Sequence, residues 1–316
     1  MKKLRVIYCG TPDFSVPTLE MLTHHSAIEV VGVVTMPDRP AGRGQELKSP
    51  EVAVFAKENN LALIQTENIN REEGQLVKGE SEGSDAISVL AFAKFVGTRL
   101  LALPKLGCFN IHTSLLPKYR GAAPIQHALW NGDKQTGVSI QKMVKKMDAG
   151  DLVHEHPVAI APTETGGSLT TRLKMQAAIA CSDFLANLLA DKVSYRPQDE
   201  HQVSFAPTLK KLDGYLDFAN QTVEQIQNRI RAMDPWPGTY CFLSGKRLKV
   251  LLTEKTPETI AAGKIANNNG RLIAGCRDGA VHLSYIQLEG KKASSDKDLL
   301  NGLREELELT PPKDNP

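Results

Sequence analysis

The sequence has 316 residues, of which 41% are hydrophobic and 23% are charged, and its formal net charge is +2 at pH 7. This composition is typical of a soluble globular protein, and the length favours two domains because one hydrophobic core stops growing near ~250–300 residues. No run approaches the ~18 apolar residues that span a membrane, and so small a net charge excludes nucleic-acid binding by overall charge alone.

The beginning of the chain and its cysteines indicate a cytoplasmic protein. Residues 1–10 have a basic start and only a short apolar run, whereas a secretory signal needs ~7–15 apolar residues. The five cysteines are scattered and never form a C-x-x-C pair, which argues against a disulfide framework and a structural zinc site. The eight histidines do not gather at ligand spacing, since His24 and His25 are adjacent and His154 and His156 alternate on an expected strand. We therefore expect no metal.

The first 191 residues alternate expected strands with expected helices. Strands are expected at 4–9, 28–35, 61–64, 85–91, 107–111, 136–143 and 152–160. Helices are expected at 15–22, 51–60, 71–80, 96–103, 124–131 and 168–191. A long polar loop occupies residues 36–50, and Ser49 with Pro50 is expected to start the helix that follows. This alternation predicts an α/β fold with a doubly wound, mostly parallel sheet.

The glycine after the first strand does not open a nucleotide-binding loop. Residues 10–14 lack the second glycine of G-x-G-x-x-G, and Pro12 removes an N–H group that a phosphate cradle would use. The sequence also contains no G-x-x-x-x-G-K-[ST] motif. A dinucleotide-dependent dehydrogenase and a nucleoside-triphosphate hydrolase are therefore both disfavoured.

The last third of the chain has a different pattern. Residues 192–207 are polar, bounded by proline and not periodic, so we interpret them as a linker between a domain at 1–191 and a domain at 208–316. Beyond an expected helix at 223–233, short strands alternate with turns such as Asn269-Gly270. The strands are expected at 240–243, 247–253, 263–266, 271–276 and 280–286. This regular spacing predicts a small antiparallel β-barrel.

The expected strand at 107–111 carries the first candidate site. Asn110 and His112 are two residues apart, so their side chains share one face near the carboxyl end of the strand, where open α/β sheets bind ligands. Asp148 stands downstream in a glycine-containing turn. An amide, an imidazole and a carboxylate suit acyl chemistry, because they can stabilise an oxyanion and move a proton near neutral pH. The alternative is structural: Asn110 caps a turn, His112 is a satisfied buried histidine, and Asp148 is a turn residue.

Five motifs, in this order along almost the whole chain, resemble those of the folate-dependent formyltransferases. They are GTPDF at 10–14, PDRPAGRG at 37–44, N-x-H-x-SLLP-x-YRGAAPI at 110–125, GVSI at 137–140 leading to D-x-GD at 148–151, and N-x-IRA at 228–232 leading to PWP at 235–237. Each motif is weak alone, but their order across two domains is specific. The resemblance is greatest to the members that act on tRNA.

The resemblance implies transfer of a formyl group from 10-formyltetrahydrofolate to the α-amino group of methionine on methionyl initiator tRNA. It implies a Rossmann-like catalytic domain and an oligonucleotide-binding (OB-like) barrel that contacts the tRNA. It also assigns Asn110, His112 and Asp148 to catalysis and places Ser114, Leu115, Leu116 and Pro117 against the folate. Thr113, Ala93 and Val144 depart from residues that are usual in the family.

Contacts with tRNA must come from local basic clusters, because the net charge is small. Lys118 and Arg120 form one such pair beside the catalytic strand. The residues expected to contact tRNA are Arg39, Arg43 and Lys48 in the polar loop and Lys246, Arg247 and Lys249 in the second domain. The alternative for each cluster is an ordinary solvated surface.

Three other functions remain open at this point. The first is formyl transfer to a small amine, such as an amino sugar nucleotide or glycinamide ribonucleotide, against which the loop at 36–50 and the second domain argue. The second is hydrolysis of formylfolate, and the third is RNA binding without catalysis, against which the retention of all three catalytic groups argues. We also expect a monomer that does not associate with membranes.

Overall fold

In the computed structural model of the chain, the described residues are 3–42, 44–72, 83–92, 94–302 and 307–311. They form two compact units, which are treated separately below. The first unit comprises Met1–Pro124, Gln135–Ala159 and Thr170–Ala206, and the second comprises Ile125–Lys134, Ile160–Leu169 and Pro207–Pro316. No helix within the described residues is both long enough and apolar enough to cross a membrane.

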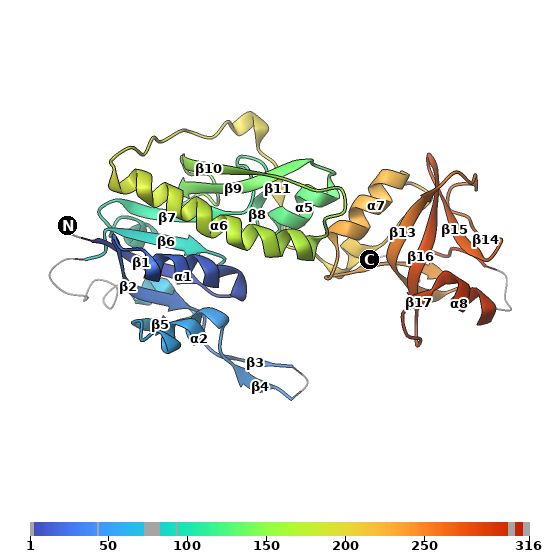
Figure 1. Ribbon diagram of the computed structural model, residues 1–316, viewed down its shortest axis with the longest axis horizontal. Helices are drawn as coiled ribbons and strands as arrows, with labels where there is room; N and C mark the ends of the chain where they lie inside the picture. The colour runs from blue at the N-terminus through green and yellow to red at the C-terminus, as the bar shows by residue number, and fades with distance from the viewer. Residues whose placement is uncertain (1–2, 43, 73–82, 93, 303–306, 312–316) are drawn as a thin grey trace. The chain divides into compact units, whose positions relative to one another are not determined.

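The first unit is built on a seven-stranded sheet with the strand order β10-β9-β7-β6-β1-β2-β5 (Figure 1). The strands are β1 (Leu4–Gly10), β2 (Ile28–Thr35), β5 (Leu63–Gln65), β6 (Ala86–Leu90), β7 (Gly107–His112), β9 (Gln135–Lys142) and β10 (Leu152–Ala159). The pairs from β5 through β7 are parallel, whereas β9 is antiparallel to both β7 and β10. The predicted α/β fold with a mostly parallel, Rossmann-like sheet is therefore confirmed.

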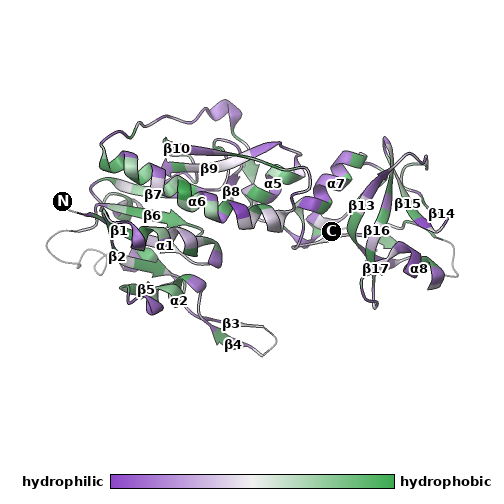
Figure 2. Cartoon of the chain, viewed as in Figure 1, coloured by the Kyte–Doolittle hydropathy of each residue, from purple (hydrophilic) through white to green (hydrophobic). Residues whose placement is uncertain are grey.

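Hydrophobic side chains explain why the inner strands of this sheet are buried. Figure 2 shows β2 and β6 mostly in the hydrophobic colour, and every residue of β6 is buried. Strands that are covered on both faces need such apolar runs. Helices α1 (Val16–His24) and α6 (Gly166–Leu189) lie over one face of the sheet in Figure 1. The ring of Phe184 in α6 lies 4.8 Å from that of Phe109 in β7.

The other helices of the first part of the chain are short. They are α2 (Glu51–Glu58), α4 (Thr98–Leu101) and α5 (Pro124–Trp130). Pro50, not Ser49, occupies the N-cap position of α2, and no side chain caps that helix. The expected Ser49 cap is therefore wrong. The helix expected at 71–80 falls almost wholly outside the described residues, which show only a 3-10 turn at Ile69–Arg71.

The polar segment at 36–50 is more regular than expected. It contains a two-stranded antiparallel hairpin made of β3 (Arg39–Ala41) and β4 (Glu46–Lys48). The pairing satisfies backbone groups that a plain loop would leave to water. The prediction of an irregular loop was wrong here. The segment is polar, and strands of three residues are too short to show a recognisable alternation of apolar and polar residues.

The segment after α6 is bonded to the first unit. Arg196 and Leu152 exchange backbone hydrogen bonds of 2.9 and 2.8 Å. Farther on, β11 (Phe205–Ala206) pairs in parallel with β8 (Arg120–Gly121). A polar, aperiodic sequence therefore carries residues that are held in place beside the candidate site.

The second unit contains an antiparallel sheet with the order β12-β13-β16-β15-β14, and β17 pairs with β16. Its strands are β12 (Thr239–Leu243), β13 (Lys246–Thr256), β14 (Ile265–Asn268), β15 (Arg271–Cys276), β16 (Gly279–Leu288) and β17 (Ser294–Ser295). Helix α7 (Val223–Ala232) begins with a capping box between Thr222 and Gln225. Helix α8 (Asp296–Gly302) was not expected. The antiparallel strands confirm the predicted β class, while an OB-like barrel stays a prediction.

Candidate active site

Strand β7 places Asn110 and His112 on one face of the sheet. In the register with β9, Asn110 lies opposite Gln141 and His112 lies opposite Ser139. Directly paired residues of antiparallel strands project to the same face, so four polar side chains meet there. The sequence predicted from their i, i+2 spacing that Asn110 and His112 share this face, and the structure brings Asp148 to the same place.

Asp148 is held by three hydrogen-bond donors. Its Oδ1 accepts from Asn110 Nδ2 at 3.2 Å and from Gln141 Nε2 at 3.1 Å, and its Oδ2 accepts from the backbone N–H of Gly121 at 2.9 Å. The backbone φ of Asp148 is 50°, a conformation that non-glycine residues adopt at some cost unless surrounding contacts enforce it. All three groups donate to the carboxylate, which suits its ionised form.

The His112 ring has one nitrogen bonded and one facing Asp148. Nε2 lies 2.9 Å from the backbone oxygen of Tyr119, and Nδ1 lies 3.8 Å from Asp148 Oδ2. A carbonyl oxygen can only accept, so Nε2 carries a proton and donates it. We assign the neutral tautomer from this contact. Nδ1 is consequently the nitrogen that can gain or lose a proton beside the carboxylate.

Two glutamines that the sequence analysis missed hold the Asp148 turn. Gln141 Oε1 accepts from the backbone N–H of Gly150 at 2.9 Å. Gln198 Nε2 donates to the backbone oxygens of Asp148 at 2.9 Å and Gly150 at 2.7 Å. A signal existed for Gln141, because it follows Ser139 by two residues and so shares its face of the strand. None existed for Gln198, because its segment is polar and aperiodic.

Arg120 is a buried part of this support. The residue is 1% exposed, its Nε and Nη2 donate to Gln198 Oε1 at 3.1 and 2.8 Å, and Nη2 also donates to Glu200 at 2.8 Å. Hydrogen bonds from Arg120 and Lys146 lower the pKa of Glu200 to about 2. The interpretation of Arg120 as part of a basic surface is therefore wrong, because its guanidinium is buried among these partners.

The segment expected to bind folate is tightly folded. Ser114 Oγ donates to the backbone oxygen of Lys118 at 2.6 Å, and Ser139 Oγ accepts from the N–H of Leu116 at 3.0 Å. Ser114 and Leu116 are buried, whereas Leu115 and Pro117 are partly exposed. These contacts fix the backbone next to His112, and the folate-binding role of the four residues stays a prediction.

A pocket of about 480 Å³ opens at the ends of β1 and β2. It is lined by Thr11, Pro12, Met36, Pro37, Arg39, Lys48, Ser49, Pro50, Glu51 and Lys94. None of the three expected catalytic residues lines it. It nevertheless lies at the same edge of the sheet, because Gly10 pairs with Leu90 of β6 and β6 pairs in parallel with β7. Two strand spacings correspond to roughly 10 Å.

The expected tRNA-contacting residues are found in different surroundings. Arg39 pairs with Glu67 at 2.7 Å and Lys48 pairs with Glu51 at 2.7 Å, all on the surface. In the second unit Lys246 and Lys249 are exposed, and the Arg247 guanidinium lies 3.8 Å from the centre of the Tyr240 ring. Arg43 and Ala93 lie outside the described residues.

The cysteines take no part in this chemistry. All five are buried and free, and burial raises the pKa of Cys108 to about 12. A thiol with such a pKa has almost no reactive thiolate at neutral pH.

Comparison with known proteins identifies the family. Residues 2–185 match the model of the family described as Formyl transferase, and residues 208–304 match that described as Formyl transferase, C-terminal domain. A protein of Geobacter sulfurreducens named methionyl-tRNA formyltransferase is 39% identical over 305 residues, which cover 96% of this chain and 95% of that protein. This chain belongs to the formyl transferase family.

Two further comparisons extend this formyl transferase assignment. A methionyl-tRNA formyltransferase of Bacillus subtilis is 37% identical over 302 residues, 94% of each chain. An N-formyltransferase of Helicobacter canadensis, solved in complex with folinic acid and dTDP-3-aminofucose, superposes with a TM-score of 0.66 at 17% identity, covering 92% of this chain and all of that one. The resemblance read from the sequence is confirmed, and the protein is a formyl-transferring enzyme.

Proposed function

We propose that this formyltransferase moves the formyl group of 10-formyltetrahydrofolate to the α-amino group of methionine on initiator tRNA. The observation that carries the proposal is the convergence of Asn110, His112 and Asp148 at the carboxyl edge of the sheet. The names of its sequence relatives support the tRNA acceptor. The folinic acid in the Helicobacter canadensis structure, itself a formylated folate, supports a folate donor.

The first step is attack of the neutral amine on the formyl carbon. A new C–N bond forms, and the carbonyl oxygen becomes an oxyanion. Asn110 Nδ2 carries two hydrogens, one of which it donates to Asp148, so the second is available for the oxyanion. A donor placed for such an oxygen typically accelerates the reaction ~10²–10³-fold.

The second step breaks the bond between the formyl carbon and the folate nitrogen. The attacking amine must lose one proton and the departing nitrogen must gain one. His112 Nδ1 is suited to this transfer, because Nε2 is engaged with Tyr119 and cannot turn toward the substrate without losing that bond. Nδ1 takes the proton from the amine and passes it to the departing nitrogen, and Asp148, 3.8 Å away, stabilises the ring while it is charged.

The hairpin β3–β4 and the pocket at its base form the proposed entry for the aminoacyl end of tRNA. Arg39 and Lys48 line the pocket, and their present partners are exposed carboxylates. Exposed ion pairs are worth ~0–1 kcal/mol, so a phosphate can replace these carboxylates at little cost. Arg43, between the two strands in sequence, belongs to the same proposal.

The second domain, residues 208–316, is the other proposed tRNA-binding surface, joined to a catalytic domain at 1–191 by residues 192–207. Arg247 and Lys249 lie on one face of β13, next to Tyr240 and Phe242 of β12. Basic side chains beside aromatic rings suit contacts with both phosphates and bases. Lys246 extends this cluster at the turn.

The test supplies labelled 10-formyltetrahydrofolate together with one of three acceptors: methionyl initiator tRNA, an amino sugar nucleotide or glycinamide ribonucleotide. We expect label on the methionyl amine only. Transfer to a small amine would replace the proposed acceptor. Release of labelled formate without transfer would indicate a hydrolase and overturn the proposal.

A further inference from the structure

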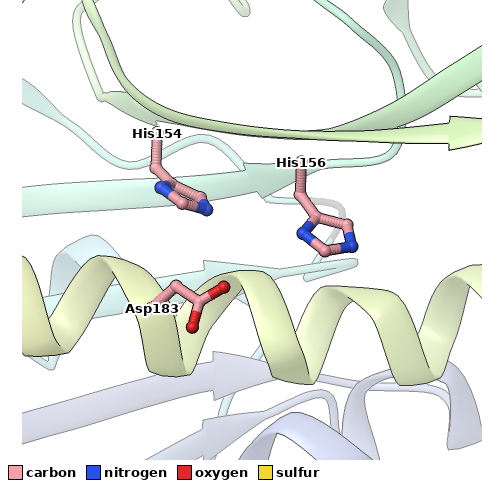
Figure 3. Close-up of side chains that lie close together, drawn as sticks. All are labelled: His154, His156 and Asp183. Carbon is pink, nitrogen blue, oxygen red and sulfur yellow. The ribbon is translucent and has the colours of Figure 1, made fainter.

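A second group of polar side chains lies on the opposite face of the sheet from the active site. His154 and His156 of β10 pair in register with Ile140 and Val138 of β9, whereas the intervening Glu155 pairs with Ser139. Ser139 belongs to the face of His112, so the two histidines project to the other face. Figure 3 shows both rings pointing toward helix α6, from which Asp183 points back toward them.

The three side chains are spaced for a common ligand. Each offers one ligand atom, and these atoms lie within 4.8 Å of one another. Among the described residues no hydrogen bond joins any two of the three. Ligands of a tetrahedral ion with bonds of ~2.0–2.2 Å lie roughly 3.4 Å apart. Side-chain rotations that move these ligand atoms by about 1 Å would bring them to that spacing.

The orientation of His156 is already set for metal binding. Its Nε2 lies 2.7 Å from Gln176 Oε1, an acceptor, so Nε2 carries the proton and Nδ1 carries the lone pair that can bind a metal. Gln176 and Asp183 are seven residues apart on α6 and therefore lie on one face of the helix. Histidines that bind metals usually donate their other N–H in this way.

His154 supplies an independent observation. Its Nε2 is buried and has no hydrogen-bond partner among the described residues. A buried polar atom without a partner is destabilising, and a bound cation would remove that cost.

We propose that His154, His156 and Asp183 bind one Zn²⁺ ion. Two imidazoles and a carboxylate are a known ligand set for zinc, with water in the fourth position. Asp183 is exposed, which gives the ion a path from solvent. The bound ion would fasten the edge strand β10 to helix α6, so its effect is on the stability of the first unit and not on the formyl transfer step.

The test is a titration of metal-free protein with Zn²⁺ against a chromophoric chelator at neutral pH, repeated with Co²⁺ to record its visible spectrum. We expect one ion per chain and a cobalt spectrum of a four-coordinate site. Zinc at 100 times its Kd should raise the Tm by roughly 5–10 °C. Metal-free protein should retain its formyl transfer activity.

Variants separate this site from weaker binding by other histidines. His156→Ala and Asp183→Asn should each weaken binding at least tenfold, and Gln176→Ala should weaken it about 10–100-fold by freeing the ring of His156. His24→Ala, which removes an exposed histidine on another helix, should leave the affinity unchanged. Circular dichroism checks that each variant is folded.

Two results would overturn the proposal. One is wild-type binding weaker than about 0.1 mM, because such a site would be empty at ordinary zinc concentrations. The other is a stoichiometric zinc site that both His156→Ala and Asp183→Asn leave intact, since the ion would then be bound elsewhere.

Discussion

Replacing Gln198 by alanine tests whether the Asp148 turn is held from outside the catalytic strands. The glutamine amide donates to the backbone oxygens of Asp148 and Gly150, and its oxygen accepts from Nε and Nη2 of Arg120. The variant would leave these groups without those partners, although it removes no proposed catalytic group. Nη1 of Arg120 is already buried without a partner among the described residues.

The cost can be estimated from these bonds. A hydrogen bond between neutral groups contributes ~0.5–1.5 kcal/mol and one to a charged group ~1.5–3 kcal/mol. Gln198 is only partly buried, so water can replace some of the lost contacts, and we expect a net loss of about 2–4 kcal/mol. That loss corresponds to a fall in Tm of roughly 5–15 °C. A shift of the turn by about 1 Å would lower kcat/KM by up to ~10²-fold.

The assay combines calorimetry with steady-state kinetics at a temperature where the variant is folded. Gln202→Ala is the matched control, because Gln202 is exposed and, among the described residues, its side chain donates only to Asp199. We expect the control to behave as wild type. A Gln198→Ala protein with unchanged Tm and unchanged kcat/KM would refute the claim that this segment positions the carboxylate.

Three other substitutions test separate parts of the structure. The folded pKa of Glu200, about 2, lies below its unfolded value of ~4.3, so its ion pairs stabilise the protein fully above that value and lose this effect as the pH falls toward 2. By calorimetry, the Tm of Glu200→Gln should lie below that of the wild type at neutral pH, and the difference should disappear as the pH falls from ~4.3 to about 2. A difference that stays constant over this range would contradict the role of these ion pairs. A methyl group at Gly150 would overlap the backbone oxygen of Lys142, so Gly150→Ala should lower the Tm by about 5 °C or more, whereas Gly302→Ala, in open space, should not. Arg39→Ala should make the dependence of log kcat/KM for tRNA on log salt shallower by about 0.7–0.9 without changing KM for the folate; an unchanged slope would exclude a phosphate contact.

The sequence predicted the fold well where hydrophobic patterns are long. Strand β2 has the expected bounds because its β-branched residues are continuous, and β7 was placed within one residue. The site core was also predictable, since Asn110 and His112 need only the period of a strand to share a face. Asp148 was a candidate from its residue type and turn, but its link to the strand rested on the family resemblance, because nothing local connects residues 38 positions apart.

The supporting residues could not be predicted, because long-range contacts define them. Arginine usually lies on the surface, so nothing in the sequence indicated that Arg120 is buried. Its guanidinium donates to Gln198, which is far away in the sequence. His154 and His156 were not expected at ligand spacing, but their ligand atoms and that of Asp183 lie within 4.8 Å of one another. Their third neighbour, Asp183, comes from a helix whose rotation over the sheet the sequence does not reveal.

Single-turnover transfer from 10-formyltetrahydrofolate to methionyl initiator tRNA by the Asn110→Ala variant tests the catalytic assignment most directly. The spare N–H of Asn110 is the donor proposed for the oxyanion, so the transfer rate should fall ~10²–10³-fold while fold and tRNA affinity are preserved. A variant that transfers the formyl group at close to the wild-type rate would contradict the assignment.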